Sequence, residues 1–253
     1  MRVLITGASE GIGSALAAYL ADVIGADNLF LTDDGISCAE VLACCHTVPS
    51  CLEQEEAAAV INEIRPDRLI ILPCRSGEDY RRIFERNAYR SIYFMEALRN
   101  ADFSCRTAFV TSADIYQPSS EPISEDAAML ASTPFAVCLL TMDELAYLYF
   151  KAYKLETIRI RPFECISVMP ASDEIKLRSE ELTGKNVPLL FDYLSADEAS
   201  RALWNVLERG APGSAYNLCS GYGTASGPGA QIGWVGNPSK ILELGIAFNK
   251  FKY

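Results

Sequence analysis

The chain has 253 residues, and its 33 acidic and 22 basic side chains give a net charge of −11, which argues against nucleic acid or an anionic membrane as the main partner. Half of the residues are apolar and 22% are charged, which is typical of a globular protein and excludes wholesale disorder. No apolar run approaches the roughly 18 residues that a membrane span needs. The nine cysteines are an odd number scattered through apolar segments, so we expect free thiols and a cytoplasmic protein.

Short apolar strands alternate with longer helical segments as far as Pro162. Continuous apolar strands separated by helices are typical of a parallel sheet that is covered on both faces. We therefore expect an α/β fold with a doubly wound parallel sheet of six or seven strands. The predicted strands are Arg2–Ile5, Asn28–Thr32, Glu40–Cys45, Arg68–Leu72, Thr107–Thr111 and Thr157–Ile160, and the predicted helices are Ile12–Ile24, Glu53–Ile64, Asp79–Arg99 and Val137–Lys154.

The regular alternation ends after Pro162, which divides the chain into a core over residues 1–162 and a small, reduced C-terminal lobe over residues 163–253, interleaved with the core. The stretch Gly221–Gly233 holds five glycines and one proline, which predicts a loop or a disordered segment. The other elements predicted in the lobe are helices over Ser172–Leu182, Ala196–Glu208 and Lys240–Leu244 and strands over Val187–Phe191 and Ala215–Leu218.

A glycine-rich turn joins the first predicted strand to the first predicted helix, with the sequence Thr6-Gly7-Ala8-Ser9-Glu10-Gly11-Ile12-Gly13. Gly7 permits a tight turn, Gly11 lets a pyrophosphate approach the backbone, and Gly13 allows close helix–strand packing. About 20 residues later the second strand ends at Asp33, whose carboxylate would bind the adenosine ribose hydroxyls and favour NAD over NADP. This pattern predicts a Rossmann-like, NAD-binding core; the alternative is a strand–helix turn without a ligand. The predicted cofactor contacts in this region are Gly7, Ser9, Glu10, Gly11, Ile12, Gly13 and Asp33.

Further motifs occur along most of the chain in one recognisable order. They are Ile64-Arg65-Pro66-Asp67-Arg68-Leu69-Ile70 with the pair Pro73-Cys74, then Asn87, Val110-Thr111-Ser112-Ala113-Asp114-Ile115-Tyr116, Arg161-Pro162-Phe163, Ala215-Tyr216-Asn217-Leu218-Cys219-Ser220-Gly221 and Asn237-Pro238-Ser239-Lys240. Together with the glycine turn, they resemble the extended short-chain dehydrogenase/reductase superfamily, and within it the NAD-dependent epimerases and dehydratases of nucleotide sugars. The resemblance implies an NAD cofactor, a nucleotide-sugar substrate and a homodimer. It adds to the predicted cofactor contacts Cys51 (where the family has an acidic residue that contacts adenine), Leu52, Pro73, Cys74, Asn87 and Phe163.

The reaction centre of this family is a Ser or Thr with a Tyr-x-x-x-Lys pair on the following helix. The resemblance places Ser112 in the first role. The usual spacing before Arg161 places Phe135 and Leu139 at the Tyr and Lys positions. Neither side chain can transfer a proton, which indicates relaxed or altered function. A literal Tyr-x-x-x-Lys occurs at Tyr147 and Lys151, about 18 Å beyond Phe135 on the same helix, and packing or dimer contact is our preferred interpretation of it.

Two carboxylates are candidate substitutes for the missing pair. Asp114 is the second residue after Ser112, where dehydratases of the family often carry an acid, and Glu164 follows Arg161-Pro162-Phe163. A carboxylate desolvated beside a nicotinamide ring can act as acid or base. Three hypotheses therefore remain: an epimerase- or dehydratase-like enzyme with unusual acid/base groups, a silent NAD-binding relative serving as a sensor or partner subunit, and a structural descendant that binds nothing. The intact glycine turn and Asp33 count against the third.

Other groupings of side chains have simpler explanations in ordinary packing. Adjacent cysteines on a strand point to opposite faces, so Cys44, Cys45, His46 and Cys51 predict no metal site. Cys74 and Cys138 would flank the cofactor cleft, although buried structural cysteine is the commoner case. The i, i+4 stripe of Arg82, Arg86 and Arg90 fits either a subunit contact or a solvated face, and both alternatives stay open. The residues Tyr147, Tyr149, Phe150 and Tyr153 are expected to pack in the core or a dimer contact.

Overall fold

The structure is a computed structural model that describes residues 1–8, 12–32, 45–74, 79–166, 177–180 and 187–248. Its main sheet has seven strands in the order β3-β2-β1-β4-β5-β6-β9, and every neighbouring pair is parallel. The predicted Rossmann-like, doubly wound sheet is therefore confirmed. The strands are β1 Val3–Thr6, β2 Leu29–Thr32, β3 His46–Val48, β4 Arg68–Ile71, β5 Arg106–Val110, β6 Thr157–Pro162 and β9 Ala215–Leu218.

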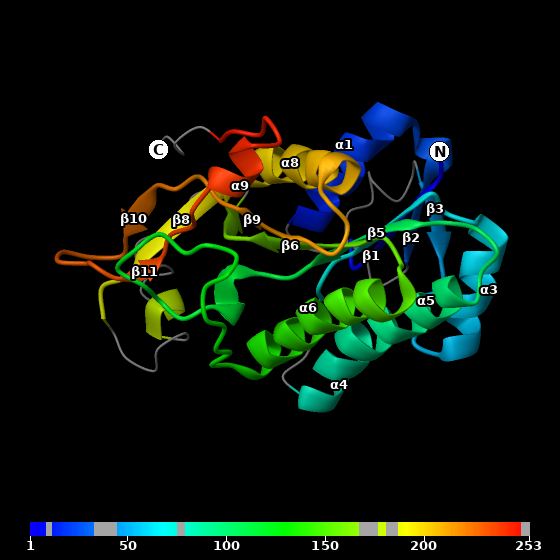
Figure 1. The fold of residues 1–253 in the computed structure, drawn as a ribbon, viewed down its shortest axis with the longest axis horizontal. Helices are drawn as coiled ribbons and strands as arrows, with labels where there is room; N and C mark the ends of the chain where they lie inside the picture. Colours follow the sequence, from blue (N-terminus) through cyan, green and yellow to red (C-terminus); the bar gives the residue numbers. More distant parts are fainter. Residues whose placement is uncertain (9–11, 33–44, 75–78, 167–176, 181–186, 249–253) are drawn as a thin grey trace.

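Helices cover both faces of this sheet (Figure 1). Because successive side chains of a strand point to opposite faces, Val3 and Ile5 of β1 enter the core cluster under α1 and α8, whereas Leu4 enters the cluster under α3, α5 and α6. The helices are α1 Ile12–Ile24, α3 Gln54–Ile64, α4 Tyr80–Phe84, α5 Arg90–Arg99, α6 Pro134–Tyr153, α8 Ala196–Arg209 and α9 Ser239–Leu242, with short helical turns at Ala26–Asn28 (η1) and Ala113–Ile115 (η3) and a π-helical turn at Glu85–Tyr89 (η2).

A smaller sheet is formed by the C-terminal part of the chain. Its central strand is β8 (Leu190–Ser195), which pairs with β10 (Gly223–Ala225), β11 (Gly233–Trp234) and β7 (Glu164–Ile166). The prediction of a loop over Gly221–Gly233 was therefore wrong for the two short strands, because their pairing with β8 overrides the low strand propensity of glycine. β8 also starts later than the predicted strand over Val187–Phe191.

The buried Asp192 side chain ties the small sheet to the end of the main one. Its carboxylate accepts hydrogen bonds from the backbone and hydroxyl of Ser220 and from the backbone N–H groups of Gly221 and Gly236. Burial raises the pKa of Asp192, while these donors favour its charged form. Residues after 162 thus build the small sheet and also complete the main sheet with β9.

Several predicted boundaries shift for local reasons. α6 begins at Pro134 rather than Val137, because the Thr133 hydroxyl accepts the Ala136 N–H at 3.1 Å and proline suits the first helical position. The third strand that the structure describes is His46–Val48, and residues 40–44 of the strand predicted over Glu40–Cys45 lie outside the described residues. Of the helix expected over Ser172–Leu182, residues 177–180 are described and are helical.

The predicted arginine stripe does not form one face. The long helix expected over Asp79–Arg99 is interrupted by η2, whose π turn takes up an extra residue and rotates the next helical turns about the axis. Arg82 is exposed and Arg86 half-buried, whereas Arg90 is fully buried. The three arginines therefore form neither a fully solvated face nor a continuous contact surface, and both interpretations of the stripe were wrong. No helix within the described part of the chain has the length and apolar character that crossing a bilayer requires.

Candidate active site

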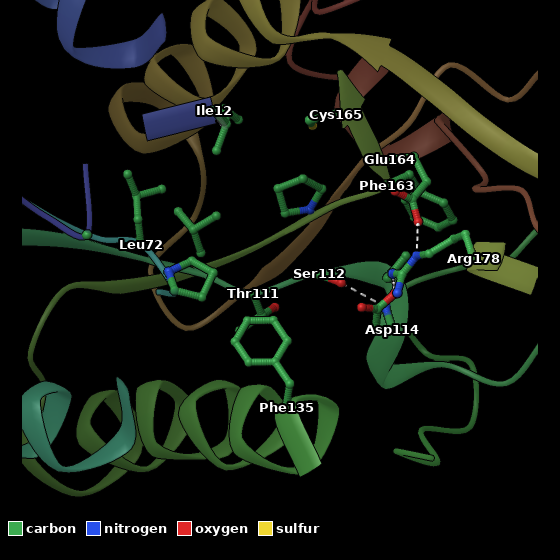
Figure 2. Close-up of a pocket in the computed structure, with 15 residues that line it drawn as sticks. Ile12, Leu72, Thr111, Ser112, Asp114, Phe135, Phe163, Glu164, Cys165 and Arg178 are labelled. Atoms are coloured by element: carbon green, nitrogen blue, oxygen red, sulfur yellow. Dashed lines mark hydrogen bonds and ion pairs between the residues drawn. The ribbon is translucent and has the colours of Figure 1, made fainter. Parts of the chain in front are cut away.

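A cavity of about 400 Å³ opens at the carboxyl ends of the central strands (Figure 2). Its walls come from the residues that follow β1, β4, β5 and β6, together with the first turns of α1 and α6. Strand order reverses between β1 and β4, and such switch points are where doubly wound sheets bind ligands. The lining residues are Gly7, Ile12, Leu72, Pro73, Val110, Thr111, Ser112, Ala113, Asp114, Phe135, Pro162, Phe163, Glu164, Cys165 and Arg178.

Two glycines of the first turn occupy positions that no other residue fits. Gly7 has a φ of +73°, and a Cβ there would lie 2.5 Å from the carbonyl oxygen of Leu72. A Cβ on Gly13 would lie 2.8 Å from the Cα of Ala8. These contacts are the tight turn and the close helix–strand packing that a dinucleotide-binding turn needs. The predicted contacts Ser9, Glu10, Gly11 and Asp33 lie outside the described residues.

Some of the other predicted cofactor contacts line the cavity, whereas Asn87 supports its wall from behind. Pro73 and Phe163 line the cavity, as do Gly7 and Ile12. Asn87 is buried behind the wall: its side chain accepts the Cys74 N–H at 2.7 Å and donates to the Cys74 carbonyl at 3.0 Å. This amide therefore holds the turn after β4 in place. Cys51 is buried with a φ of +56°, and neither it nor Leu52 is among the lining residues.

All three candidate catalytic residues lie in the cavity wall. Ser112 lies two residues after the end of β5 and caps η3, where its Oγ accepts the Asp114 N–H at 2.9 Å. Glu164 begins β7, and Phe163 alone separates it from the end of β6. Arg178 joins the two carboxylates: its Nη2 lies 2.6 Å from Asp114 Oδ1 and its Nε 3.1 Å from Glu164 Oε1 (Figure 2). The sequence did not identify Arg178, which belongs to none of the recognised motifs.

The two positions expected to carry a proton relay are apolar in the fold. Phe135, in the first turn of α6, points into the cavity near Thr111 (Figure 2). Leu139 is 0% exposed and packs in the core cluster. None of the described residues that line the cavity is a tyrosine, lysine or histidine. Tyr147 and Lys151 instead line a separate surface cleft of α6.

Comparison with known proteins agrees with this geometry. The model of the NAD dependent epimerase/dehydratase family matches residues 3–219. The chain belongs to this family. It is 24% identical over 247 residues to GDP-6-deoxy-D-mannose reductase of Pseudomonas aeruginosa, a match that covers 87% of this chain and 75% of the relative.

Solved structures of the same type share the fold of this family member. UDP-glucose 4-epimerase of Thermus thermophilus, solved in complex with NAD, superposes with a TM-score of 0.80 at 18% identity, covering 100% of this chain and 95% of that one. dTDP-glucose 4,6-dehydratase of Streptomyces venezuelae, solved with NAD bound, has a TM-score of 0.81 at 16% identity, with coverage of 100% and 93%.

Behind the cavity, this epimerase/dehydratase family member carries a buried polar network. Asp143 of α6 accepts two hydrogen bonds from Arg161 of β6, at 2.9 and 2.7 Å, and a third from Arg159 at 3.2 Å. Arg161 also donates to the Tyr116 hydroxyl, which in turn donates to Asn217 at 2.9 Å. Burial raises the pKa of Tyr116 to about 12, so this phenol stays protonated and structural. Arg161 belongs to a recognised motif, whereas no sequence pattern pointed to its partner Asp143.

The thiols near the site fit structural roles. Cys138 is fully buried, its Sγ donates to the Ile83 carbonyl at 3.7 Å, and it does not line the cavity. Burial raises its pKa to about 11, which keeps the thiol protonated and unreactive. The expectation that Cys138 flanks the cleft was therefore wrong. Among the described residues, no three histidine, cysteine or acidic side chains gather as a metal site.

Proposed function

We propose that this chain binds NAD in the cavity and acts on a nucleotide sugar held beside it, with Ser112 and Asp114 replacing the tyrosine–lysine pair. The observation that carries the proposal is the continuity of the cavity, which extends from the Gly7 turn to Ser112 and Asp114 at the carboxyl ends of the strands. The family membership supports NAD, as do the neighbours solved with NAD. The GDP-6-deoxy-D-mannose reductase and UDP-glucose 4-epimerase relatives support a nucleotide sugar.

In this proposal, the two parts of the chain bind mainly different ligands. Residues 1–162 hold the cofactor: the backbone of the Gly7 turn at the pyrophosphate, Asp33 at the adenosine ribose, and Pro73 in the wall. Residues 163–253 bring Phe163, Glu164 and Arg178 to the cavity, where Phe163 contacts the cofactor and Glu164 and Arg178 face the sugar. When bound, NAD supplies a hydride acceptor.

Ser112 and Asp114 provide the polar chemistry from the protein side. The Ser112 oxygen already accepts the Asp114 N–H, so its own hydrogen is available to a substrate oxygen. Asp114, held by Arg178, is a hydrogen-bond acceptor, so it suits the role of a base that removes a hydroxyl proton. Its proximity to Ser112 lets both groups act on one substrate carbon–oxygen unit.

The alternative is a member of the family that binds NAD without turnover and serves as a sensor or partner subunit. Two observations favour it. Phe135 and Leu139, which motif spacing assigns to the relay positions, are apolar, and Leu139 is buried in the core. In addition, Arg178 ties both candidate carboxylates in ion pairs.

The decisive experiment measures cofactor binding and turnover separately. We expect calorimetry to show NAD binding, and hydride transfer or product formation across a panel of UDP-, GDP- and dTDP-sugars. Asp114→Asn should then lower kcat by about 100-fold or more, the usual contribution of a positioned proton acceptor, with unchanged NAD affinity. The matched control is Asp102→Asn, whose carboxylate is exposed and pairs with Arg65.

Each outcome separates the hypotheses. Bound NAD with no wild-type turnover, and turnover only in the Phe135→Tyr/Leu139→Lys double variant, would establish the silent alternative. Absence of any NAD affinity would contradict both proposals. An equal loss of kcat in Asp114→Asn and Asp102→Asn would show that Asp114 has no specific role.

We further propose that the protein is a homodimer that uses the outer face of α6. This face carries a shallow cleft of about 600 Å³ with Val137 and Leu148 on it, 43% and 53% exposed. Exposed apolar clusters of this kind mark contact surfaces. Val137→Glu/Leu148→Glu should give a monomer by light scattering where the wild type gives a dimer. Val23→Glu, at a 50% exposed valine of α1, should leave the dimer intact; a monomeric wild type would refute the proposal.

We also propose a cytoplasmic location. Each cysteine that the structure describes is a free thiol, and most of these are buried, which fits a reducing compartment.

A further inference from the structure

The sugar-facing end of the cavity holds a cluster of three charged side chains. The guanidinium of Arg178 lies between the carboxylates of Asp114 and Glu164, at 2.6 and 3.1 Å. Their side chains are 16%, 7% and 27% exposed, so the cluster is largely shielded from solvent. All three residues line the cavity. We call Asp114, Arg178 and Glu164 the charged cluster.

The scaffold sets the positions of the two carboxylates in this cluster. Asp114 lies in η3, where its backbone N–H is bound by Ser112 at 2.9 Å. Glu164 starts β7, which pairs with β8 in register with Tyr193. Only Arg178 reaches in from a different part of the lobe, residues 177–180. The cluster is therefore a built part of the cavity wall and not a chance ion pair on the surface.

The chemistry of the cluster distinguishes between ligand groups. A sugar hydroxyl can donate to a carboxylate and accept from the guanidinium at the same time. A ligand carboxylate can only accept, and it would add a third anionic group beside Asp114 and Glu164. Like charges brought together in a shielded site are strongly unfavourable, so such a wall selects against a charged sugar as well as for a neutral one.

We propose that the charged cluster selects a neutral, hydroxyl-bearing sugar over the corresponding uronate, and that Arg178 is a specificity-determining residue. This inference rests on the proposed function and adds the class of sugar to it. Arg178 supplies the donor that a neutral hydroxyl accepts, and Glu164 supplies the negative charge that disfavours a carboxylate at the same place.

The test uses two matched pairs of ligands, UDP-glucose with UDP-glucuronate and GDP-mannose with GDP-mannuronate, each measured by calorimetry on the NAD-loaded protein. The two members of a pair differ only in a hydroxymethyl or carboxylate group. For the pair that binds, we expect the neutral ligand to bind at least about 10-fold tighter. Glu164→Gln should reduce this preference to about 3-fold or less, by weakening the repulsion of the uronate, and Arg178→Gln should weaken the neutral ligand about 10-fold with unchanged NAD affinity.

Glu208→Gln is the control, because it removes one carboxylate from an ion pair with Arg68, at the opposite end of β4 from the cavity. It should keep the wild-type preference, and thermal unfolding of each variant shows that the fold is intact. A uronate that binds as tightly as its neutral partner, or a preference that Glu164→Gln leaves unchanged, would overturn this inference and leave the proposed function standing. Failure of both pairs to bind while NAD binds would also overturn this inference, and absence of turnover across the full panel of UDP-, GDP- and dTDP-sugars would in addition contradict the nucleotide-sugar part of the proposed function.

Discussion

Asp143→Ala is expected to destabilise the protein by about 3–5 kcal/mol, because removing one partner of a buried ion pair leaves the other charge without compensation. Asp143 is 0% exposed and accepts two hydrogen bonds from Arg161, which is itself 1% exposed, and one from Arg159. The guanidinium of Arg161 cannot lose its proton in a protein, so the charge stays buried in the variant. Chemical denaturation monitored by circular dichroism measures this loss directly.

Glu63→Ala is the matched control for this prediction, since Glu63 is an exposed acidic residue of α3, away from the proposed dimer face. It should change the free energy of unfolding by no more than about 0.5 kcal/mol, as surface substitutions usually do. A similar small change for Asp143→Ala would show that Arg159 and Arg161 find other partners and that the network is not essential to stability.

The hydrogen-bond network around Asp143 also holds the wall of the cavity in place. Arg161 lies one residue before the segment Pro162–Cys165 that lines the cavity, and it donates to Tyr116, which follows η3. The ring of Tyr116 stacks on Phe163 with the centroids 6.4 Å apart. Two separate parts of the wall are thus held against one buried carboxylate, and a variant that loosens Asp143 should widen the cavity before the whole fold is lost.

Features that depend on neighbouring residues in the chain were predictable from sequence. The turn at Gly7 and Gly13 is recognisable because only glycine tolerates a positive φ at the first position and the close approach of Ala8 at the second. Most strands of the main sheet were predictable because continuous apolar runs are typical of strands buried on both faces, whereas the largely exposed edge strand β3 has no such run. Motif spacing predicts that Phe135 and Leu139 stand at the relay positions, which stays a prediction; the fold places Phe135 in the cavity wall and Leu139 in the core.

Features that depend on distant residues were not predictable. Arg178 and Asp114 are separated by 64 residues, and no local pattern indicates that they meet. The pairing of β10 and β11 with β8 is likewise long-range, and the glycine-rich composition of that segment pointed to a loop. The π turn over Glu85–Tyr89 changes which side of the helix faces the core, and this moved Arg90 from an expected surface stripe to a buried position.

Gly7→Val is expected to weaken NAD binding. A β-branched residue at a φ of +73° costs about 1–3 kcal/mol in backbone conformation alone. Its Cβ would also lie 2.5 Å from the Leu72 carbonyl oxygen and 3.1 Å from the carbonyl carbon, both backbone atoms of the segment after β4 that cannot rotate away. The turn must therefore open, and we expect the NAD affinity measured by calorimetry to fall by at least about 10-fold, equivalent to about 1.4 kcal/mol of binding free energy.

The control for this variant is Gly227→Ala, because a Cβ at Gly227 would meet nothing closer than 3.7 Å and its φ is not positive. Its NAD affinity and stability should match the wild type. If Gly7→Val binds NAD as tightly as wild type while the protein remains folded, the dinucleotide does not lie against this turn, and the cofactor site must be sought away from the switch point between β1 and β4. A Gly7→Val protein that loses NAD affinity, but is destabilised by no more than the about 1–3 kcal/mol of local backbone strain, would retain the Asp143 network. This result would separate the role of the turn from that of the core behind it.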